Sequence, residues 1–576
     1  MTNREIAQLL KDIAAAYEVK GEAFFKVTAY NNAADAIEHA TSEVKDLWEE
    51  GRLDSLPGVG ASISQHLDEL FRTGKVKHFD QVKKDLPPGM FAINGISGIG
   101  PKTAYRLASQ LGVRTLADLE KVARKGKIRN LEGFGQKSEE DILRSIGELR
   151  RRTGRVLLTF ADENAQKIVD WMKKCPAVEK IEPLGSLRRM VATVGDIDLA
   201  AATEKPDEVI KHFLKYPKVA RVIEAGGKSA SVSLGNGIQV DIKVVPLRSF
   251  GALLQHFTGS KHHNIALREL ALKKGWSLSE YGIKIARKIH PFSTEESFYQ
   301  KLGLDWIPPE LREDIGEIEA ALAHNLPDLV ELEDIKGDVH LHSSFDVETG
   351  HDLGKDSFED LIAKARQLGY EYLGFSEHTP GLGTHSAQQI ENLVSKHNRS
   401  IEQLKSSRVI NILTGFEVDI LVDGKLSLPE NLLGNLDFVI AGVHSSMRQT
   451  KEQMTKRILA AIENKYVNII AHPTGRLLNE REEYEVDWEQ IFDAVKEKSK
   501  ILEINAWPVR LDLPDVLVRE AVKRGVKMII NTDSHAVDHL DNMRYGVSVA
   551  RRGWAQKKDI VNTLPWVEFK KYFRVK

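Results

Sequence analysis

The sequence predicts a multidomain protein with all-α N-terminal domains, an α/β (α+β) domain in the middle and a (β/α) barrel at the C-terminus. Apolar residues recur at three- and four-residue spacing from Glu5 to about Leu86, which indicates short helices. From about Val156, β-like runs alternate with helical stretches, which favours a mixed sheet. Beyond Lys336 a short β run follows each helical stretch, the pattern of a closed or nearly closed barrel. At 576 residues and 42% hydrophobic content, the chain is long enough for several cores.

The composition excludes several classes of protein. With 81 Lys and Arg against 83 Asp and Glu, the net charge of −2 argues against a polycationic coat protein. The surplus of basic residues is confined to residues 1–300, where a polyanion is the expected partner. Cys175 is the only cysteine, so we expect no internal disulfide and a reducing compartment. Without an apolar signal segment or an 18-residue apolar run, we expect no membrane association and a cytoplasmic location.

The first two predicted domains, residues 1–86 and 87–150, contain repeated glycine turns between helices. Residues 56–60 read Leu-Pro-Gly-Val-Gly, residues 98–102 read Gly-Ile-Gly-Pro-Lys, and a weaker copy lies at 131–137. Such turns let two helices meet and leave the N–H groups of the next helix open to a phosphate. They resemble the helix-hairpin-helix, a motif that binds the DNA backbone. The residues expected to bind DNA are Gly58, Gly60, Gly98, Gly100 and Lys102.

The third predicted domain, residues 151–250, carries three carboxylates on β-like runs. Asp196 and Asp198 are two apart, so their side chains share one face of a strand. Asp241 lies on a second apolar run, 238–245. Clustered carboxylates repel one another unless a cation lies between them, and Mg²⁺ prefers such oxygen ligands. We therefore expect Asp196, Asp198 and Asp241 to be the catalytic residues and to hold Mg²⁺ or Mn²⁺.

This pattern resembles the nucleotidyltransferase palm of the DNA polymerase beta superfamily, because Gly185-Ser186 and Arg189 precede the aspartate pair. Residues 257–260, Phe-Thr-Gly-Ser, resemble the nucleotide-binding segment of family X DNA polymerases, in a nucleotide-selecting subdomain expected at 251–307. The resemblance implies that Ser186 and Arg189 bind the triphosphate. The complete set of implied nucleotide-binding residues is Ser186, Arg189, His256, Phe257, Gly259, Asn264 and Arg268.

One feature of the polymerase beta relatives is not carried over. They form a Schiff base with a lysine in the helix after the first hairpin, where this chain has His66, and Ser62 stands where a second lysine would assist. An imidazole does not form that imine. We therefore expect no deoxyribose-phosphate lyase activity.

After an acidic linker expected at 308–336, the last domain, residues 337–576, places histidines and acids at the ends of successive β runs. His340 and His342 begin the series as a His-x-His pair, which puts both rings on one face of a strand. Imidazole with carboxylate suits Zn²⁺, Mn²⁺ or Fe²⁺, and a bridging acid can hold two or three such ions together. The series therefore predicts a multinuclear metal site at the carboxyl ends of the barrel strands.

This series resembles the PHP (polymerase and histidinol phosphatase) domain, a phosphoesterase with three metals that is fused to bacterial family X polymerases. The resemblance implies eight metal ligands: His340, His342, His378, Glu417, His444, His472, Asp533 and His535. The family's ninth ligand falls in a segment with an apparent insertion. Asp352 is the candidate for it, with His351, Glu348 and Asp346 as alternatives.

Together the resemblances imply a DNA polymerase that fills short gaps in DNA repair, with a metal-dependent 3′–5′ exonuclease in the barrel and cleavage at abasic sites as a further expected activity. Gapped or primed DNA and dNTPs are the expected partners; the sequence identifies no protein partner. Two alternatives stay open. The first is a phosphatase of small phosphate esters whose polymerase half has decayed, and the second is a DNA end-bridging protein without catalytic activity.

Overall fold

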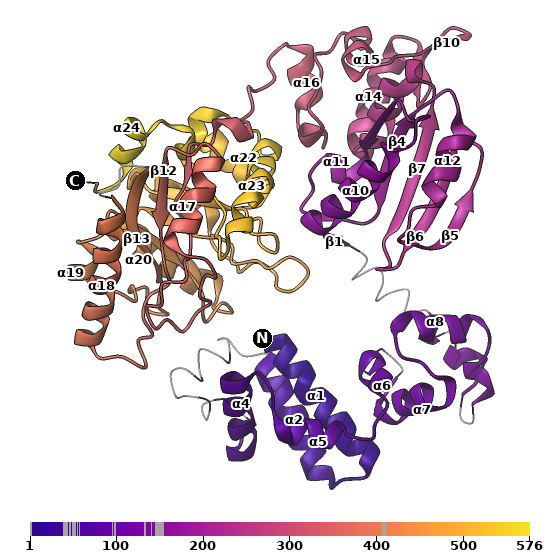
Figure 1. Cartoon of the computed structure of the whole chain (residues 1–576). Helices are drawn as coiled ribbons and strands as arrows, with labels where there is room; N and C mark the ends of the chain where they lie inside the picture. The colour runs from indigo at the N-terminus through magenta and orange to yellow at the C-terminus, as the bar shows by residue number, and fades with distance from the viewer. Residues whose placement is uncertain are drawn as a thin grey trace. The chain divides into compact units, whose positions relative to one another are not determined.

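The computed structural model describes residues 3–38, 58–94, 99–131, 134–139, 141–143, 155–405 and 410–575, and the single positions 44, 48, 53, 56 and 96. Its contacts divide the chain into two compact units, drawn in Figure 1. The first comprises Met1–Gly154, Pro380–Asn392 and His444–Thr450, and the second comprises Arg155–Thr379, Leu393–Val443 and Lys451–Lys576.

The N-terminal part of the first unit is all-α, as the sequence predicts. Gly60 and Gly100 are the N-caps of α4 and α7, and both helices end at a left-handed glycine, Gly74 and Gly112. Buried apolar side chains form two separate cores, one around Leu67 and one that includes Met90 and Leu107. The helices are α1 (Asn3–Lys20), α2 (Phe24–Glu38), α4 (Ala61–Thr73), α5 (Lys77–Lys83), α6 (Pro88–Ile93), α7 (Pro101–Leu111) and α8 (Leu116–Arg124), followed by the 3₁₀ turn η2 (Ile128–Asn130).

The palm of the second unit is a five-stranded mixed sheet of order β2-β4-β7-β6-β5. Its central strands β4 and β7 run parallel, and the other pairs are antiparallel. The strands are β2 (Lys180–Pro183), β4 (Ile197–Ala202), β5 (Val219–Ala225), β6 (Ser229–Leu234) and β7 (Gln239–Val245); β1 (Val156–Leu157) and β3 (Thr193–Val194) form a separate pair. The palm helices are α10 (Leu158–Met172), α11 (Gly185–Arg188), α12 (Pro206–Leu214) and the 3₁₀ turn η3 (Leu247–Ser249). This arrangement confirms the predicted α/β palm.

The chain then builds a smaller subdomain around one apolar core. Phe298, Tyr299 and Leu302 lie at its centre, and Leu311 and Ile318 from the expected linker pack into the same core. Trp554, more than 200 residues away in the sequence, also belongs to it. The elements are α13 (Phe250–Thr258), α14 (Lys261–Lys273), β8 (Trp276–Ser279), β9 (Gly282–Ile285), β10 (Lys288–His290), α15 (Glu295–Leu302), η4 (Pro309–Leu311), α16 (Glu317–Leu322) and η5 (Leu332–Asp334). Within the expected linker 308–336, the chain forms the α-helix α16 over Glu317–Leu322.

Seven parallel strands form the last sheet, in sequence order from β11 to β17. A bridge between Leu341 and Ser534, just beyond the first and last strands, brings the two edges together, so the barrel is nearly closed as predicted. The strands are β11 (Gly337–Asp338), β12 (Tyr372–Phe375), β13 (Asn411–Asp419), β14 (Phe438–Gly442), β15 (Ile469–Ile470), β16 (Ile501–Asn505) and β17 (Met528–Asn531). The α-helices are α17 (Phe358–Gln367), α18 (Ala387–Lys405), α19 (Glu430–Leu433), α20 (Lys451–Glu463), α21 (Trp488–Glu497), α22 (Asp515–Arg524), α23 (Met543–Arg552) and α24 (Trp566–Phe569). The 3₁₀ turns are η6 (Val537–Asn542), η7 (Lys557–Asp559), η8 (Val561–Thr563) and η9 (Lys570–Tyr572).

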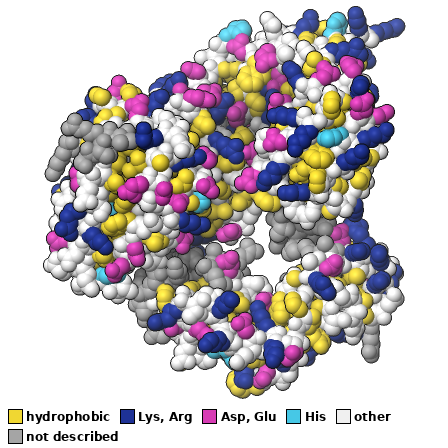
Figure 2. All heavy atoms as spheres, in the orientation of Figure 1, with side chains coloured by type: hydrophobic (Ala, Val, Ile, Leu, Met, Phe, Trp, Pro, Cys, Tyr) yellow, Lys and Arg dark blue, Asp and Glu magenta, His cyan; other side chains and the backbone are white. Residues whose placement is uncertain are grey.

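Over the face that Figure 2 shows, Lys and Arg side chains are interspersed with Asp and Glu. In the part of the chain that the structure describes, no helix has both the length and the apolar character that a bilayer crossing requires.

Candidate active sites

Three carboxylates meet on the two parallel strands of the palm. The register of β4 with β7 places Asp198 opposite Asp241. Asp196 comes directly before β4 and two residues before Asp198, so the extended chain points both side chains the same way. The sheet therefore brings together the three aspartates that the sequence singles out.

Burial and neighbouring carboxylates raise the pKa of Asp196 and of Asp198. Burial, with the charges of Asp196 and Asp241, raises the pKa of Asp198 to about 6. Burial and Asp241 also raise the pKa of Asp196. Gln239 Nε2 donates to both carboxylate oxygens of Asp241, at 3.2 and 3.1 Å. A divalent cation would relieve this repulsion, so the donor set fits Mg²⁺ or Mn²⁺.

The short helix α11 carries Ser186 and begins beside these carboxylates. Gly185 has φ +60°, and a Cβ atom there would lie 3.1 Å from Asp198 Oδ2. The Leu184 N–H donates to the Asp198 carbonyl at 2.8 Å. Only a glycine suits this turn, and it holds Ser186 next to the aspartates.

Arg189 lies between α11 and the segment that follows α13. Its Nε donates to Glu313 Oε1 at 3.0 Å, and its Nη1 donates to the carbonyl of Thr258. A Cβ atom on Gly259 would lie 3.0 Å from Arg189 Nη1. Burial lowers the pKa of Arg189, and Glu313 counteracts this effect. The structure thus brings Arg189 and Gly259 together, as their assignment to one nucleotide site predicts.

The remaining nucleotide candidates form one group across α13 and α14, joined by hydrogen bonds and ring contacts. Asn264 Nδ2 donates to the carbonyl of His256 at 2.7 Å, and Arg268 Nε donates to the carbonyl of Asn264 at 3.0 Å. The rings of His256 and Phe257 meet edge to face with centroids 4.8 Å apart. Lys243 Nζ lies 4.6 Å from the centroid of the Phe257 ring. Since Lys243 lies two residues after Asp241 on β7, it links this group to the aspartates.

The hairpin glycines occupy the turns where the sequence predicts them. Gly58 has φ +83°, and a Cβ atom there would lie 3.3 Å from the backbone of Asn32. Gly60 and Gly100 cap their helices, and Lys102 lies in the first turn of α7. Gly98 falls outside the described residues. Binding of a phosphate by these groups stays a prediction.

His66 belongs to a cluster of rings in the first helical domain. Its ring stacks on that of His78 with centroids 4.8 Å apart and an interplanar angle of 7°. The Tyr30 hydroxyl lies 3.0 Å from His66 Nδ1, and the Tyr17 hydroxyl lies 2.6 Å from His78 Nε2. Burial, followed by His78, lowers the pKa of His66. Ser62 is exposed.

In the barrel, Glu417 is the centre of a buried group of metal-ligand side chains. Its Oε2 lies 3.2 Å from His340 Nε2, 3.5 Å from His342 Nε2 and 3.1 Å from His378 Nδ1. Its Oε1 lies 2.8 Å from His472 Nε2. A carboxylate with both oxygens among four imidazoles suits a bridging ligand.

Among the described residues, four overlapping sets of side chains each offer ligand atoms that lie within 4.8 Å of one another. One consists of His340, His342, Glu417 and Asp533, all buried; the others are His342, His378 and His535; His378, Glu417 and His444; and His351, Asp419 and His444. The ring of His342 stacks against those of His378 and His535, with centroids 4.4 and 4.2 Å away. Burial, followed by His342, lowers the pKa of His535 to about 4.

The ring nitrogens of this group fit metal ions. His340 Nε2 and both ring nitrogens of His342 are buried and accept or donate no hydrogen bond among the described residues. Leaving such atoms without a partner is costly unless they bind something. Their proximity to Glu417 and Asp533 gives the nitrogen and oxygen donors that Mn²⁺, Zn²⁺ or Fe²⁺ accept.

His444 and the ninth position complete the predicted set. His444 follows β14, which pairs with the Glu417 strand β13. At the insertion, His351 Nε2 lies 3.4 Å from Asp419 Oδ2, and the His351 ring lies 4.6 Å from that of His378. Asp352 is exposed and belongs to none of the four ligand sets, whereas His351 belongs to one of them. The geometry favours His351 over Asp352 as the ninth ligand.

Comparison with protein families finds four matches along the chain. Residues 1–76 match the helix-hairpin-helix domain, and residues 92–148 match the SAM-like helix-hairpin-helix tandem. Residues 253–313 match the DNA polymerase beta thumb, and residues 338–506 match the PHP domain.

One relative spans nearly the whole chain. It is the DNA polymerase/3′-5′ exonuclease PolX of Bacillus subtilis (strain 168), 35% identical over 570 residues, which cover 98% of this chain and 97% of the relative. The chain belongs to the PolX family. DNA polymerase lambda of Rattus norvegicus is 26% identical over 349 residues, 54% of this chain and 56% of the relative. A probable phosphatase of Clostridium acetobutylicum is 31% identical over 208 residues, 34% of this chain and 78% of the relative.

Two buried acids of this PolX-family barrel escape sequence reasoning. Glu503 Oε1 lies 2.7 Å from His340 Nδ1, and Glu503 Oε2 accepts from the His472 N–H at 2.9 Å. Asp338 accepts from the His340 N–H at 3.1 Å and from the Thr532 hydroxyl at 2.6 Å. Both acids fix the orientation of ligand-bearing segments. The sequence signal that could have found them is a lone acid on a predicted strand, within β16 for Glu503 and at the end of β11 for Asp338.

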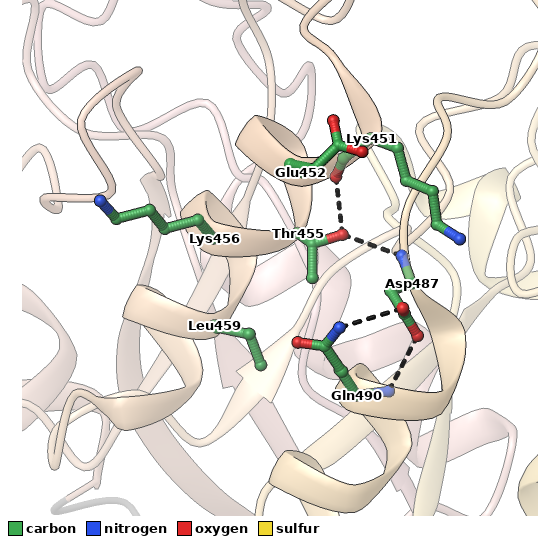
Figure 3. A pocket seen from close by; sticks show the side chains of 7 residues that line it. All are labelled: Lys451, Glu452, Thr455, Lys456, Leu459, Asp487 and Gln490. Carbon is green, nitrogen blue, oxygen red and sulfur yellow. Dashed lines mark hydrogen bonds between the residues drawn. The ribbon is translucent and has the colours of Figure 1, made fainter.

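A groove of about 490 Å³ lies outside the barrel, between α20 and α21 (Figure 3). The Thr455 hydroxyl donates to the carbonyl of Lys451 at 2.7 Å and accepts from the Asp487 N–H at 2.8 Å. Gln490 donates to Asp487 through both its backbone and side-chain nitrogens. None of the residues that line the groove is a predicted site residue, and we assign it no function.

Proposed function

We propose that this PolX-family chain is a DNA-directed DNA polymerase that fills short gaps during DNA repair and a metal-dependent 3′–5′ exonuclease. The observation that supports the polymerase most strongly is the convergence of Asp196, Asp198 and Asp241 on β4 and β7, beside α11. Cleavage at abasic sites is a further proposed activity of the barrel. A cytoplasmic location and the domain boundaries expected from the sequence remain part of the proposal.

In the palm, Asp196 and Asp198 would hold Mg²⁺ or Mn²⁺. Such ions supply the positive charge that stabilises the attacking and leaving oxygens of phosphoryl transfer. Asp241 lies opposite Asp198 and would receive the proton of the primer 3′-hydroxyl. Ser186 and Arg189 would bind the triphosphate, since a guanidinium can donate two parallel hydrogen bonds to a phosphate.

Around the incoming nucleotide, His256 and Phe257 would line the sugar pocket. Asn264 and Arg268 would contact the nascent base pair or the template. The Asn264–His256 hydrogen bond holds α14 against the end of α13, and the Arg268–Asn264 hydrogen bond within α14 limits the movement of the Arg268 side chain. Gly259 lets the backbone approach Arg189 closely. The helix-hairpin-helix turns would hold the DNA on either side through its phosphates.

In the barrel, the proposed ligands would hold up to three ions of Mn²⁺, Zn²⁺ or Fe²⁺. Such ions polarise a phosphodiester and lower the pKa of an attacking water. Glu417 would bridge ions, and Glu503 would keep His340 in the tautomer that presents Nε2. The proposed ligands are His340, His342, His351, His378, Glu417, His444, His472, Asp533 and His535; His351 takes the place that the sequence suggested for Asp352.

A labelled primer on a gapped duplex tests this proposal and both alternatives. With dNTPs and Mg²⁺ or Mn²⁺ the protein should extend the primer, and without dNTPs it should shorten the primer from the 3′ end. Asp241→Ala should lose extension by several orders of magnitude and keep shortening. His340→Ala with His342→Ala should do the reverse. Hydrolysis of small phosphate esters without extension would support the phosphatase alternative, and DNA binding without either reaction would support the bridging alternative.

A further inference from the structure

The last residue of α23, in the barrel, contacts the polymerase site. Arg552 Nη1 donates to the carbonyl of Arg189 at 2.8 Å and to Glu313 Oε1 at 3.0 Å. Its Nε and Nη2 both lie 2.7 Å from Asp515 Oδ2. The Arg552 side chain is 9% exposed. The contact is therefore a fixed, largely buried arrangement and not a loose surface ion pair.

Glu313 is shared by two arginines. The same oxygen, Oε1, accepts from Arg189 Nε and from Arg552 Nη1, both at 3.0 Å. Asp515 supplies the second negative charge, so two cations and two anions balance. Because Glu313 forms ion pairs with two arginines, its negative charge only partly offsets the positive charge of Arg189. The Arg189 guanidinium can therefore still attract another anion. Without Arg552, Glu313 would neutralise Arg189 alone.

Arg552 also fixes the backbone at this point. Met190, the next residue after Arg189, has φ +55°, a conformation that costs a non-glycine residue free energy. The carbonyl that Arg552 binds belongs to the peptide between these two residues. The side chain and the main chain of Arg189 are thus both held by the Glu313–Arg552 pair.

We propose that Glu313 and Arg552 are positioning residues for Arg189, through which the barrel sets the affinity of the polymerase site for dNTPs. This inference rests on the proposed polymerase function and on the role of Arg189 in binding the triphosphate. Neither Glu313 nor Arg552 needs to touch the nucleotide. Loss of Arg552 should weaken dNTP binding in the ground state, because Arg189 would be both misoriented and more fully neutralised.

The neighbouring Arg551 provides a matched control. It lies on the same helix and is buried to a similar extent, with 13% of its side chain exposed. Its Nε donates to Glu310 at 2.7 Å, and its Nη1 lies 2.6 Å from Glu331. These partners also belong to residues 308–336, but none is a nucleotide candidate. Arg551→Ala should therefore loosen the contact between α23 and residues 308–336 without changing the orientation of the Arg189 side chain.

The experiment measures single-nucleotide gap filling by the full-length protein, with KM for the dNTP and kcat determined separately. For Arg552→Ala we expect a KM about ten-fold above wild type with kcat within about three-fold, the effect of one charge-assisted hydrogen bond. Arg552→Lys keeps the positive charge and one donor group, so its KM should lie between those of the wild type and Arg552→Ala. Arg551→Ala should have the KM of the wild type. Shortening of the primer without dNTPs should be equal in all four proteins, which also shows that each is folded.

An unchanged KM in Arg552→Ala would overturn the inference, and so would an equal rise in Arg551→Ala, since that result would mean general loosening. If Arg552→Ala does not fold, Arg552→Lys decides, and a KM equal to wild type in that variant would count against the inference. A wild-type protein that extends no primer would refute the proposed polymerase function instead, so the two failures are distinguishable.

Discussion

Replacing Asp198 by Asn should abolish extension and yet stabilise the metal-free palm. The ionised form of Asp198 is disfavoured in the folded protein, because burial and the two neighbouring aspartates raise its pKa from 3.8 to about 6. At 1.36 kcal/mol per pKa unit this is about 3 kcal/mol at most. The side chain keeps some contact with solvent, so we expect about 1–2 kcal/mol after screening. If the palm and the adjoining subdomain unfold together as a domain of about 150–250 residues, at about 2–4 °C per kcal/mol, that corresponds to a Tm increase of about 2–8 °C.

The sign depends on pH. Below about pH 4 Asp198 is protonated in both the folded and the unfolded protein, so the folded state carries no penalty. Between about pH 4 and pH 6 the Asp198 carboxyl loses its proton more readily in the unfolded chain than in the folded protein. The free energy of unfolding therefore falls as the pH rises through this range. Above about pH 6 the penalty is complete. Asp198→Asn should therefore raise the Tm at pH 7.5 and leave it nearly unchanged at pH 4.

The assay is thermal unfolding in EDTA at both pH values, repeated with Mg²⁺. Mg²⁺ should raise the Tm of the wild type more than that of Asp198→Asn, since the ion relieves the same repulsion. Asp170→Asn, at an exposed position on α10, is the control and should change stability by less than about 0.5 kcal/mol. A lower Tm for Asp198→Asn at pH 7.5 in EDTA would refute the reasoning.

Three further predictions concern the other sites. Gly58→Val should weaken binding to gapped DNA, because φ +83° and the nearby Asn32 backbone leave no room for a side chain. The affinity of the wild type for gapped DNA should fall with salt and not depend on DNA sequence. An affinity that changes neither with salt nor with this substitution would remove the hairpin assignment. Borohydride should trap almost no adduct with an incised abasic site, since His66 stands in place of the lysine, and strong trapping at a lysine in residues 1–86 would contradict this. His351→Ala should lower the bound metal per chain measured by elemental analysis, and Asp352→Ala should not; the opposite pattern would restore Asp352 as the ninth ligand.

Local patterns predicted much of the two candidate sites. The residues of the Asp196/Asp198 pair and of the His340/His342 pair are two apart, the first pair at the start of β4 and the second just beyond the end of β11, so an extended backbone points the two side chains of each pair the same way. The same holds for the barrel, whose strands and helices alternate with a clear period. Gly185 entered the prediction only through the resemblance to the polymerase beta superfamily, and its close approach to Asp198 is seen only in the structure.

Other features depend on contacts between distant segments. Glu503 contacts His340 across 163 positions of the sequence, and Arg552 contacts Arg189 across 363. No local spacing encodes such pairs. The preference for His351 over Asp352 as the ninth ligand depends on the path of the inserted segment, which the sequence does not show. Residues 308–336 read as a linker because they are acidic and contain prolines, but Leu311 and others in that segment are core residues whose partners lie on α15.

Trp554 makes the polymerase half dependent on the C-terminal end of the chain. Its indole is 7% exposed and fills part of the apolar core that Phe298 and Tyr299 build, while Arg519 covers the ring at 3.7 Å. A fragment that stopped after residue 336 would leave a hole of indole size in that core and expose its lining. The two halves are thus not interchangeable modules: grafting a barrel from another relative onto this palm would require a side chain of matching shape at this position, and evolution of either half is constrained by the other.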